Sequence, residues 1–543
     1  VNVVNGNLTV NTDSNGILAG YAKDATVNIL ANNITINSGE NGIFTTWGDN
    51  FLDAILNGYR GNVNIGSSDR KVESLYINAG GQGIDNKLGN VNIYGSKDSI
   101  ISIKTDSTGG EMENQDGILN ESGQVVIEGG NVIVSADYGY GINNNSTKVD
   151  IDAAGSVSIV SKDIPIDGKD PIVNAGINNT TGVTEITAEQ GITVESTHNG
   201  IYATGGTVKF DGGTKNKITA VDHGIYATGK NTQVTLSADN YEIYVNNNSG
   251  EPGGVAKGIY VSNGATKKIV SKGNTTITSE GNVRDIIGIH ADAGGTVDID
   301  AVSLNIKATA NDANVDNYLS GILAGDINQN VDTDNATVIA DVDGDIHVDI
   351  YSAGTDSYGI KTNKNGNVDL TSHEGNITIN ALDNVEAYTG ATKYGIHTGL
   401  GGQTTLVAEN GSISVNAGDS ETYRGNNHGI HNGGEMLIDA KENVSIGSYS
   451  YGDPSFNAYG SGIDVAYGTT TIKAGKNFVL DSISSTDFEG SKNYGAQLSN
   501  QSIIDIDAAN VTIKSKGNIS TAIYEYGASK LNIDAVSNNE ING

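Results

Sequence analysis

The chain of 543 residues carries 64 acidic and 31 basic residues, so its formal net charge is −33. This balance argues against nucleic acid as a partner, because no basic surface is available to release counterions. It also disfavours docking on anionic membranes. The chain has no cysteine, which excludes disulfides and thiolate–metal sites. No apolar run reaches about 18 residues, so we expect no direct insertion of this segment into a membrane.

A phrase built on the dipeptide Gly-Ile recurs along the chain. Its spacing runs from 24 residues, as from Gly117 to Gly141, to 41 residues, as from Gly42 to Gly83. Recurrence with a period of about 20–50 residues is typical of repeat architectures. The copies begin at Gly16, Gly42, Gly83, Gly117, Gly141, Gly176, Gly200, Gly224, Gly258, Gly288, Gly321, Gly359, Gly395, Gly429 and Gly462, with degenerate copies at Gly495 and Ala522.

The shortest repeat shows what one unit contains. Residues 200–205 read GIYATG and return at 224–229, and residues 207–210 and 217–220 between them alternate apolar and polar side chains. Such alternation predicts strands, so each repeat should hold three short strands. Stacked at about 4.8 Å, these repeats predict an all-β, right-handed parallel β-helix of roughly 17 rungs and roughly 80 Å.

One early segment departs from this pattern. In residues 47–56, Phe51, Leu52, Ile55 and Leu56 fall at helical spacing behind a candidate N-cap, Asp49 or Asn50. We therefore predict a short helix that covers the solenoid locally.

Longer repeats gain their extra residues mainly just before the next Gly-Ile dipeptide. We predict one domain over 1–543, with excursion-poor rungs at about 84–240, excursion-rich rungs at about 309–494, and the excursions on one corner of the solenoid. The predicted excursions are 162–175, 239–257, 309–320, 351–358, 383–394, 417–428, 449–461 and 483–494.

The residues within each predicted strand divide into an inward and an outward set. Ile201, Ile225 and Ile259 should stack inside. Asparagines that follow the dipeptide by two positions either form an inward hydrogen-bonded ladder or occupy left-handed corners; these are Asn86, Asn120, Asn144 and Asn179.

Outward aromatic and histidine side chains next to the dipeptide are the candidate binding residues. Tyrosine offers a flat apolar face with a polar tip, which suits recognition, while mutual stacking that stabilises the rungs is the alternative. The candidates are Tyr202, Tyr226, Tyr260, His290, Tyr358, Tyr394, His397, His428, His431, Tyr451 and Tyr459.

Repeated Val-Asp-Ile-Asp runs, as at 149–152 and 297–300, predict an acidic outer ridge. A solvated surface that opposes aggregation and loose Ca²⁺ binding are the two interpretations. No EF-hand loop or Ca²⁺-binding nonapeptide array occurs. The histidines show no metal-binding spacing, so we expect no metal and no cofactor.

Motifs for catalysis are weak. Residues 11–13 match one fragment of the polygalacturonase pattern, but its partner fragments are missing, and no serine-nucleophile motif occurs. We therefore expect no enzymatic activity.

The 24-residue rungs, the Gly-Ile-x-Ala/Asn openings and the absence of cysteine resemble the passenger of a bacterial type V secretion (autotransporter) adhesin. This resemblance covers essentially the whole chain and implies a β-helix on the bacterial cell surface, anchored in the outer membrane through a segment outside this sequence. It implies adhesion to host or other bacteria, autoaggregation or biofilm formation, with a surface protein or glycan as partner and with self-association. A polysaccharide-binding or polysaccharide-cleaving extracellular β-helix is the alternative.

Overall fold

The computed structural model describes residues 6–20, 25–46, 60–106, 115–163, 174–251, 253–311, 318–327, 335–352, 356–383, 392–418, 425–450, 459–484, 492–537 and 539–543. These residues form β-strands joined by turns, without a helix. The chain divides into two compact units, Val1–Ile243 and Tyr244–Gly543. The boundary falls within strand β24 (Asn240–Asn247).

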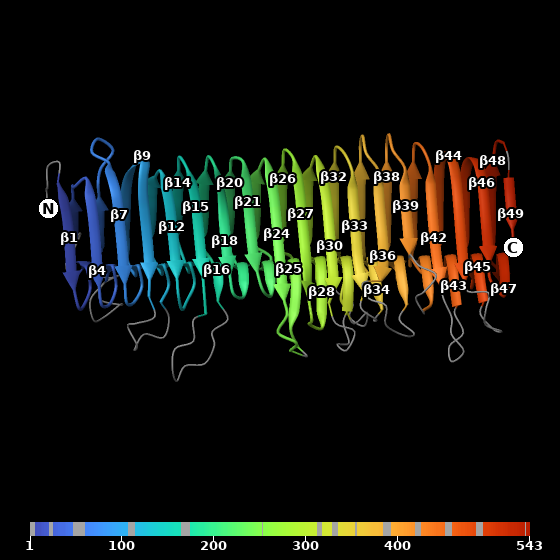
Figure 1. The fold of residues 1–543 in the computed structure, drawn as a ribbon, viewed down its shortest axis with the longest axis horizontal. Helices are drawn as coiled ribbons and strands as arrows, with labels where there is room; N and C mark the ends of the chain where they lie inside the picture. Colours follow the sequence, from blue (N-terminus) through green and yellow to red (C-terminus); the bar gives the residue numbers. More distant parts are fainter. Residues whose placement is uncertain are drawn as a thin grey trace. The chain divides into compact units, whose positions relative to one another are not determined.

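The first unit is a parallel β-helix whose rungs each contain three strands, as predicted. Strands of successive rungs pair in parallel and form three columns (Figure 1). The first column carries the Gly-Ile dipeptides and consists of β2 (Ile17–Ala19), β5 (Ile43–Thr45), β8 (Ile84–Asn86), β10 (Ile118–Asn120), β13 (Ile142–Asn144), β16 (Ala175–Asn179), β19 (Asn199–Ala203) and β22 (His223–Thr228).

The other two columns of the first unit share one long strand, β9 (Gly89–Thr105), which spans both. The second column also contains β3 (Ala25–Ile29), β6 (Gly61–Ile65), β11 (Gln124–Gly129), β14 (Lys148–Ala153), β17 (Val183–Ala188), β20 (Thr207–Gly212) and β23 (Gln233–Ala238). The third contains β1 (Asn7–Thr12), β4 (Asn33–Ser38), β7 (Val72–Ala79), β12 (Asn131–Ala136), β15 (Ser156–Ser161), β18 (Gly191–Ser196) and β21 (Lys215–Ala220).

The second unit repeats this arrangement. Its first column consists of β25 (Val255–Ser262), β28 (Asp285–Ala291), β31 (Tyr318–Ala324), β34 (Ser357–Thr362), β37 (Lys393–Thr398), β40 (Asn427–Asn432), β43 (Tyr459–Ala466), β45 (Lys492–Ser499) and β47 (Ile519–Tyr526).

Two long strands, β44 (Thr469–Ser484) and β46 (Ile503–Lys516), run through both remaining columns of this unit. The second column adds β26 (Thr266–Ser271), β29 (Thr296–Ala301), β32 (Ala336–Val342), β35 (Gly366–Ser372), β38 (Gln403–Ala408), β41 (Glu435–Ala440) and β48 (Lys530–Ala535). The third adds β27 (Asn274–Gly281), β30 (Ser303–Ala310), β33 (Ile346–Ser352), β36 (Ile377–Asp383), β39 (Ile413–Ala417), β42 (Val444–Ser450) and β49 (Asn539–Asn542).

The core of each unit consists of aligned apolar side chains. Ile201 and Ile225 are register partners in the first unit and have no exposed surface. Ile259 pairs in the same way with Ile289 in the second unit. The register and the burial confirm the predicted inward stacking within each unit. Each buried side chain of this kind contributes roughly 1.5–3 kcal/mol.

Glycine recurs in or just before the first-column strands because the backbone there lies very close to its neighbours. A Cβ atom on Gly200 would lie 2.3 Å from the Cγ2 atom of Ile218 and 2.5 Å from the carbonyl oxygen of Gly224. Gly258 and Gly395 meet equivalent obstacles, a facing methyl group and the carbonyl oxygen of the next rung's glycine. The recurrence of the dipeptide therefore has a steric cause: at these glycines a larger residue would overlap the next rung and the facing strand.

Asparagines of the first unit form the inward ladder, which decides between the two alternatives for them. Asn86 donates to Asn120 at 2.9 Å, Asn120 to Asn144 at 2.9 Å, and Asn144 to Asn179 at 3.2 Å. All four side chains have no exposed surface. The corner interpretation is therefore wrong for them.

The structure corrects one predicted excursion and leaves several other predicted segments undescribed. The excursion predicted at 239–257 is largely strand, in β24 and β25, because Tyr241, Ile243 and Val245 alternate inward and are buried. The helix predicted at 47–56 and the central parts of most other excursions lie outside the described residues. A single domain over the whole chain stays a prediction. Within the described residues, no helix is long and apolar enough to cross a membrane.

Candidate functional site

Aromatic side chains of the second unit lie in a row beside the first-column strands. We call this row the aromatic ladder. Tyr358 and Tyr394 are register partners and stack at 5.1 Å with an interplanar angle of 4°, and His428 continues the stack at 5.2 Å. The ladder comprises Tyr318, Tyr358, Tyr394, His428, Tyr459, Tyr494 and Tyr524, with neighbouring ring centroids 5.0–5.8 Å apart.

A second row of side chains runs next to the ladder. His397 and His431 stack at 5.0 Å, and the Nδ1 atom of His431 lies 3.0 Å from the Oδ2 atom of Asp464. The Lys361 ammonium group lies 4.1 Å from the ring centroid of Tyr358 and 4.8 Å from that of Tyr318. A cation over a ring face is attracted by the ring quadrupole, so this row fixes the ladder on one side.

Burial changes the protonation behaviour of this region. It lowers the pKa of His428 to about 4, although the nearby Asp464 carboxylate opposes the shift. It lowers the pKa of Lys361 to about 8, again against a nearby carboxylate, and raises the pKa of Tyr394 to about 12. His428 is therefore neutral near pH 7, and its Nδ1 atom lies 2.6 Å from the Ser461 hydroxyl.

Several of the predicted binding residues are less exposed than their predicted outward position implies. His290, Tyr358 and His428 are buried, so that prediction is wrong for them. Stacking between rungs draws these rings against the strands and against one another. Another set of candidates is half-buried, namely Tyr202, Tyr226, Tyr260, Tyr394, His397, His431 and Tyr459. Tyr451 lies outside the described residues.

The described part of the first unit contains a short ring stack at the position that the second row occupies in the second unit. Tyr202 and Tyr226 stack at 4.8 Å and 18°, and His223 meets Tyr226 edge-on at 5.1 Å. Earlier rungs replace the rings by a buried polar row, in which Asn178 donates to Asn143 and Asn143 to Asp116, both at 2.9 Å.

Two buried carboxyl groups of the early rungs, Asp116 of the polar row and Asp85, have raised pKa values. Burial raises the pKa of Asp116 to about 6, although donors from Asn143 and the Tyr140 backbone oppose the shift. Burial also raises the pKa of Asp85 to about 7, against the positive charge of Lys87. Both carboxyl groups are almost fully buried, at 1% and 3% exposure, which limits their contact with any ligand.

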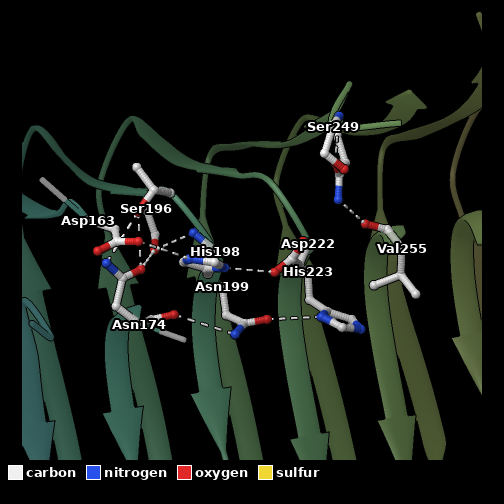
Figure 2. Close-up of polar contacts among 11 residues, drawn as sticks. Asp163, Asn174, Ser196, His198, Asn199, Asp222, His223, Ser249 and Val255 are labelled. Atoms are coloured by element: carbon white, nitrogen blue, oxygen red, sulfur yellow. Dashed lines mark hydrogen bonds and ion pairs between the residues drawn. The ribbon is translucent and has the colours of Figure 1, made fainter. Parts of the chain in front are cut away.

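His198 of the first unit lies between two carboxylates (Figure 2). Its Nδ1 atom is 3.0 Å from Asp222 and its Nε2 atom 3.8 Å from Asp163, and hydrogen bonding to Asp222 raises the pKa of the ring. The nearby Ser196 hydroxyl donates instead to Asn174 at 3.2 Å. Since both ring nitrogens face carboxylates, this group lacks the free base that a serine nucleophile needs.

A cavity of about 390 Å³ lies beside β25, β28 and β31 of the second unit. Two of the predicted binding residues, Tyr260 and His290, line it. The remaining lining residues are Lys257, Arg284, Asp285, Asp292, Tyr318, Asp326 and Ile327.

Ion pairs and hydrogen bonds connect several of the residues that line this cavity. The Arg284 guanidinium donates through two nitrogens to both oxygens of Asp285, each at 3.0 Å. The Lys257 ammonium lies 4.0 Å from Asp285 and 3.3 Å from the Nδ1 atom of His290. The Nε2 atom of His290 lies 3.2 Å from the carbonyl oxygen of Gly325 and donates to it, which leaves Nδ1 as an acceptor for Lys257.

The sequence predictions missed part of both sites. Lys361 and Asp464 occupy the same position after the dipeptide as His397 and His431, so alignment of the dipeptides could have found them. Tyr318 and Arg284 had no such signal, because they precede the dipeptide at a distance that varies between rungs. Among the described residues, no group of three or more His, Asp or Glu side chains is arranged to hold a metal ion.

Comparison of the chain with protein-family models, with curated proteins and with solved structures found no match in any of the three. Functional assignment therefore rests on the chemistry of these side chains and on the fold.

Proposed function

We propose that this chain is a non-catalytic, extracellular binding protein, a bacterial surface adhesin that attaches cells to host surfaces or to other bacteria. The aromatic ladder of the second unit, together with the row of His397 and His431 next to it, is the observation that carries the proposal. The half-buried rings among them combine an apolar face with a polar edge, the chemistry that interface hot spots favour. A surface protein or a glycan is the partner, and self-association would support autoaggregation or biofilm formation.

The scaffold favours such a role. Each rung contacts only its neighbours, so a β-helix can grow in length without a larger core. Its outer face carries charged side chains: Asp152 and Asp300 point outward and are exposed, whereas their strand neighbours Ile151 and Ile299 are buried. Repeated presentation of rings along one column then gives many weak contacts, which act together through multivalency.

The chemistry of the described residues favours binding over catalysis. The two ring nitrogens of His198 face carboxylates, and the Arg284–Asp285 pair in the cavity is satisfied internally. An acid–base pair with different proton affinities facing a common substrate position is what hydrolysis of a polysaccharide needs. The cavity nevertheless favours saccharide binding as the second candidate function.

Substitution of half-buried rings tests the adhesin function. In the full chain displayed on a non-adherent bacterium, His397→Ser, His431→Ser and Tyr459→Ser together should lower the number of adhering cells at least about 10-fold, because each anchor contributes roughly 1–2 kcal/mol. Adhesion is counted on epithelial layers and on layers of the same bacterium.

The matched control removes tyrosines that are more exposed but lie outside the ladder. Tyr467 and Tyr526 are 67% and 65% exposed, and Tyr467→Asn with Tyr526→Ser should leave adhesion within about twofold of wild type. Full adhesion by the triple variant, with an unchanged thermal midpoint, would contradict the proposal.

A further inference from the structure

We infer that the cavity lined by Lys257, Tyr260, Arg284, Asp292 and Tyr318 binds one unit of a neutral saccharide. This inference rests on the proposed function and names the chemical class of the adhesin's partner. The volume of about 390 Å³ lies within the range of roughly 300–1,000 Å³ that ligand pockets occupy.

Two polar atoms of the cavity residues lack a partner in the described part of the chain. The Tyr318 hydroxyl and the Oδ1 atom of Asp292 are both buried and make no hydrogen bond there. A buried polar atom without a partner costs about 1–3 kcal/mol. A ligand that supplies a hydrogen bond to each atom would recover this free energy.

The lining of the cavity contains both hydrogen-bond donors and hydrogen-bond acceptors. The Lys257 ammonium has three donors, of which His290 takes one. The carboxylates of Asp292 and Asp326 accept, and the Tyr318 hydroxyl does both. Each ligand hydroxyl can also donate and accept, so a polyhydroxylated ring matches this wall better than a ligand with only donors or only acceptors.

Charge favours a neutral sugar over an acidic one. Three carboxylates line the cavity, from Asp285, Asp292 and Asp326, against the two cations of Lys257 and Arg284. The Arg284 guanidinium is already bound to both oxygens of Asp285. A uronic or sialic acid would therefore add a negative charge to a lining in which carboxylates already outnumber cations.

The aromatic side chains of the cavity supply the apolar contact that a sugar ring also needs. Tyr260 is half-buried and Tyr318 begins the aromatic ladder, 5.6 Å from Tyr358. Rings of tyrosine present a flat apolar surface with a hydroxyl at one edge. The Arg284 side chain is 57% exposed, so this part of the lining is accessible from solvent.

Saccharide binding by the purified full chain tests the inference. The probes are glucose, galactose, mannose, N-acetylglucosamine, glucuronic acid and sialic acid, each measured by saturation-transfer NMR and by calorimetry. At least one neutral sugar should bind, and Tyr318→Phe and Asp292→Asn should each weaken it about 5- to 10-fold, the loss expected for one hydrogen bond.

The thermal midpoint of Tyr318→Phe shows whether the Tyr318 hydroxyl acts in binding or in folding. Tyr318→Phe removes an unpaired buried hydroxyl, so its thermal midpoint should equal or exceed that of wild type even though binding weakens. The matched control Tyr449→Phe changes a half-buried tyrosine of the same unit outside the cavity, and it should leave sugar affinity within about twofold.

The outcomes separate this inference from the proposed function. Adhesion that persists while no sugar binds, or while only acidic sugars bind, overturns the inference and leaves the adhesin function standing. Wild-type sugar affinity in both cavity variants also overturns it. Sugar binding by a chain that confers no adhesion on any cell layer overturns the proposed function alone.

Discussion

At the scale of single residues, two histidines next to Gly-Ile dipeptides have opposite protonation behaviour. His428 is 6% exposed and its ring bonds to the neutral hydroxyl of Ser461, so burial lowers its pKa to about 4. His198 lies between Asp163 and Asp222, which raise its pKa. The two residues look alike in the sequence, and only their neighbours in other rungs distinguish them.

His428 should destabilise the protein in acid. Its folded-state pKa is depressed below the unfolded value of about 6.5, so its full contribution to stability is present above that pH. This contribution is lost as pH falls toward about 4, by about 3 kcal/mol. His428→Gln should therefore lose about 3 kcal/mol less than wild type between about pH 7.5 and pH 4, measured by urea unfolding.

His198→Gln is the control for this pH dependence. Because its folded-state pKa is raised, the stability from His198 is present below about pH 6.5 and is lost as pH rises through the folded pKa. Relative to wild type, His198→Gln should therefore lose more stability when the pH is lowered, whereas His428→Gln should lose less. Identical acid sensitivity of His428→Gln and wild type would show that His428 is not the group responsible.

At the scale of an element, the atoms around a first-column strand restrict which residues can occupy two of its positions. Glycine is required at Gly200 because a Cβ atom would overlap both the next rung and the facing strand. The asparagine two positions after the dipeptide is required inside the first unit for a different reason. It continues a buried chain of amide hydrogen bonds from rung to rung.

A substitution that interrupts this buried asparagine ladder should lower the free energy of unfolding far more than one that interrupts an exposed ladder. Asn120→Ala removes the donor to the side-chain oxygen of Asn144 and one of the acceptors of the Asn86 amide, all in the core, so we expect a loss of about 2–4 kcal/mol in the free energy of unfolding. The measurement is denaturant unfolding of the full chain.

An outer ladder offers the matched control. Asn64 donates to Asn28 and accepts from Asn92, both at 2.8 Å, on the solvent-facing side of β6. Water can replace these bonds, so Asn64→Ala should cost less than about 1 kcal/mol. Equal losses for the two variants would show that burial does not set the strength of the inner ladder.

At the scale of the whole molecule, the net charge of −33 should oppose self-association at low salt. Raising NaCl from about 0.01 M to about 1 M shortens the Debye length from about 30 Å to about 3 Å, so autoaggregation of displaying cells should increase over this range. Sedimentation of the cells measures it. CaCl₂ at equal ionic strength serves as control for specific Ca²⁺ binding.

Aggregates that dissolve as salt rises would contradict a charge-limited association, because screening weakens repulsion between like charges. A response to CaCl₂ beyond that to NaCl would favour Ca²⁺ binding by the acidic outer strands over a purely solvated surface.

Much of the architecture was predictable because local chemistry specifies it. Alternating side chains predict three strands per rung, the dipeptide marks each rung, and inward residues such as Ile201 and Ile225 follow from the alternation. The length of a repeat is a weaker guide than the alternation of its side chains. The distance to the next dipeptide predicts an excursion at residues 239–257, but Tyr241, Ile243 and Val245 alternate inward and continue the strand.

The candidate sites depend on contacts that the linear pattern does not contain. Tyr358 and Tyr394 belong to successive rungs, and the length of chain between such residues varies along the protein. They meet because the parallel register of their strands brings their ring centroids to 5.1 Å. The cavity joins Lys257, Asp292 and Tyr318 from successive rungs in the same way. Local alternation sets which side of a strand a residue faces. Only the stacking of rungs decides which residues become neighbours and how far water is excluded from them, and therefore which are available to a ligand.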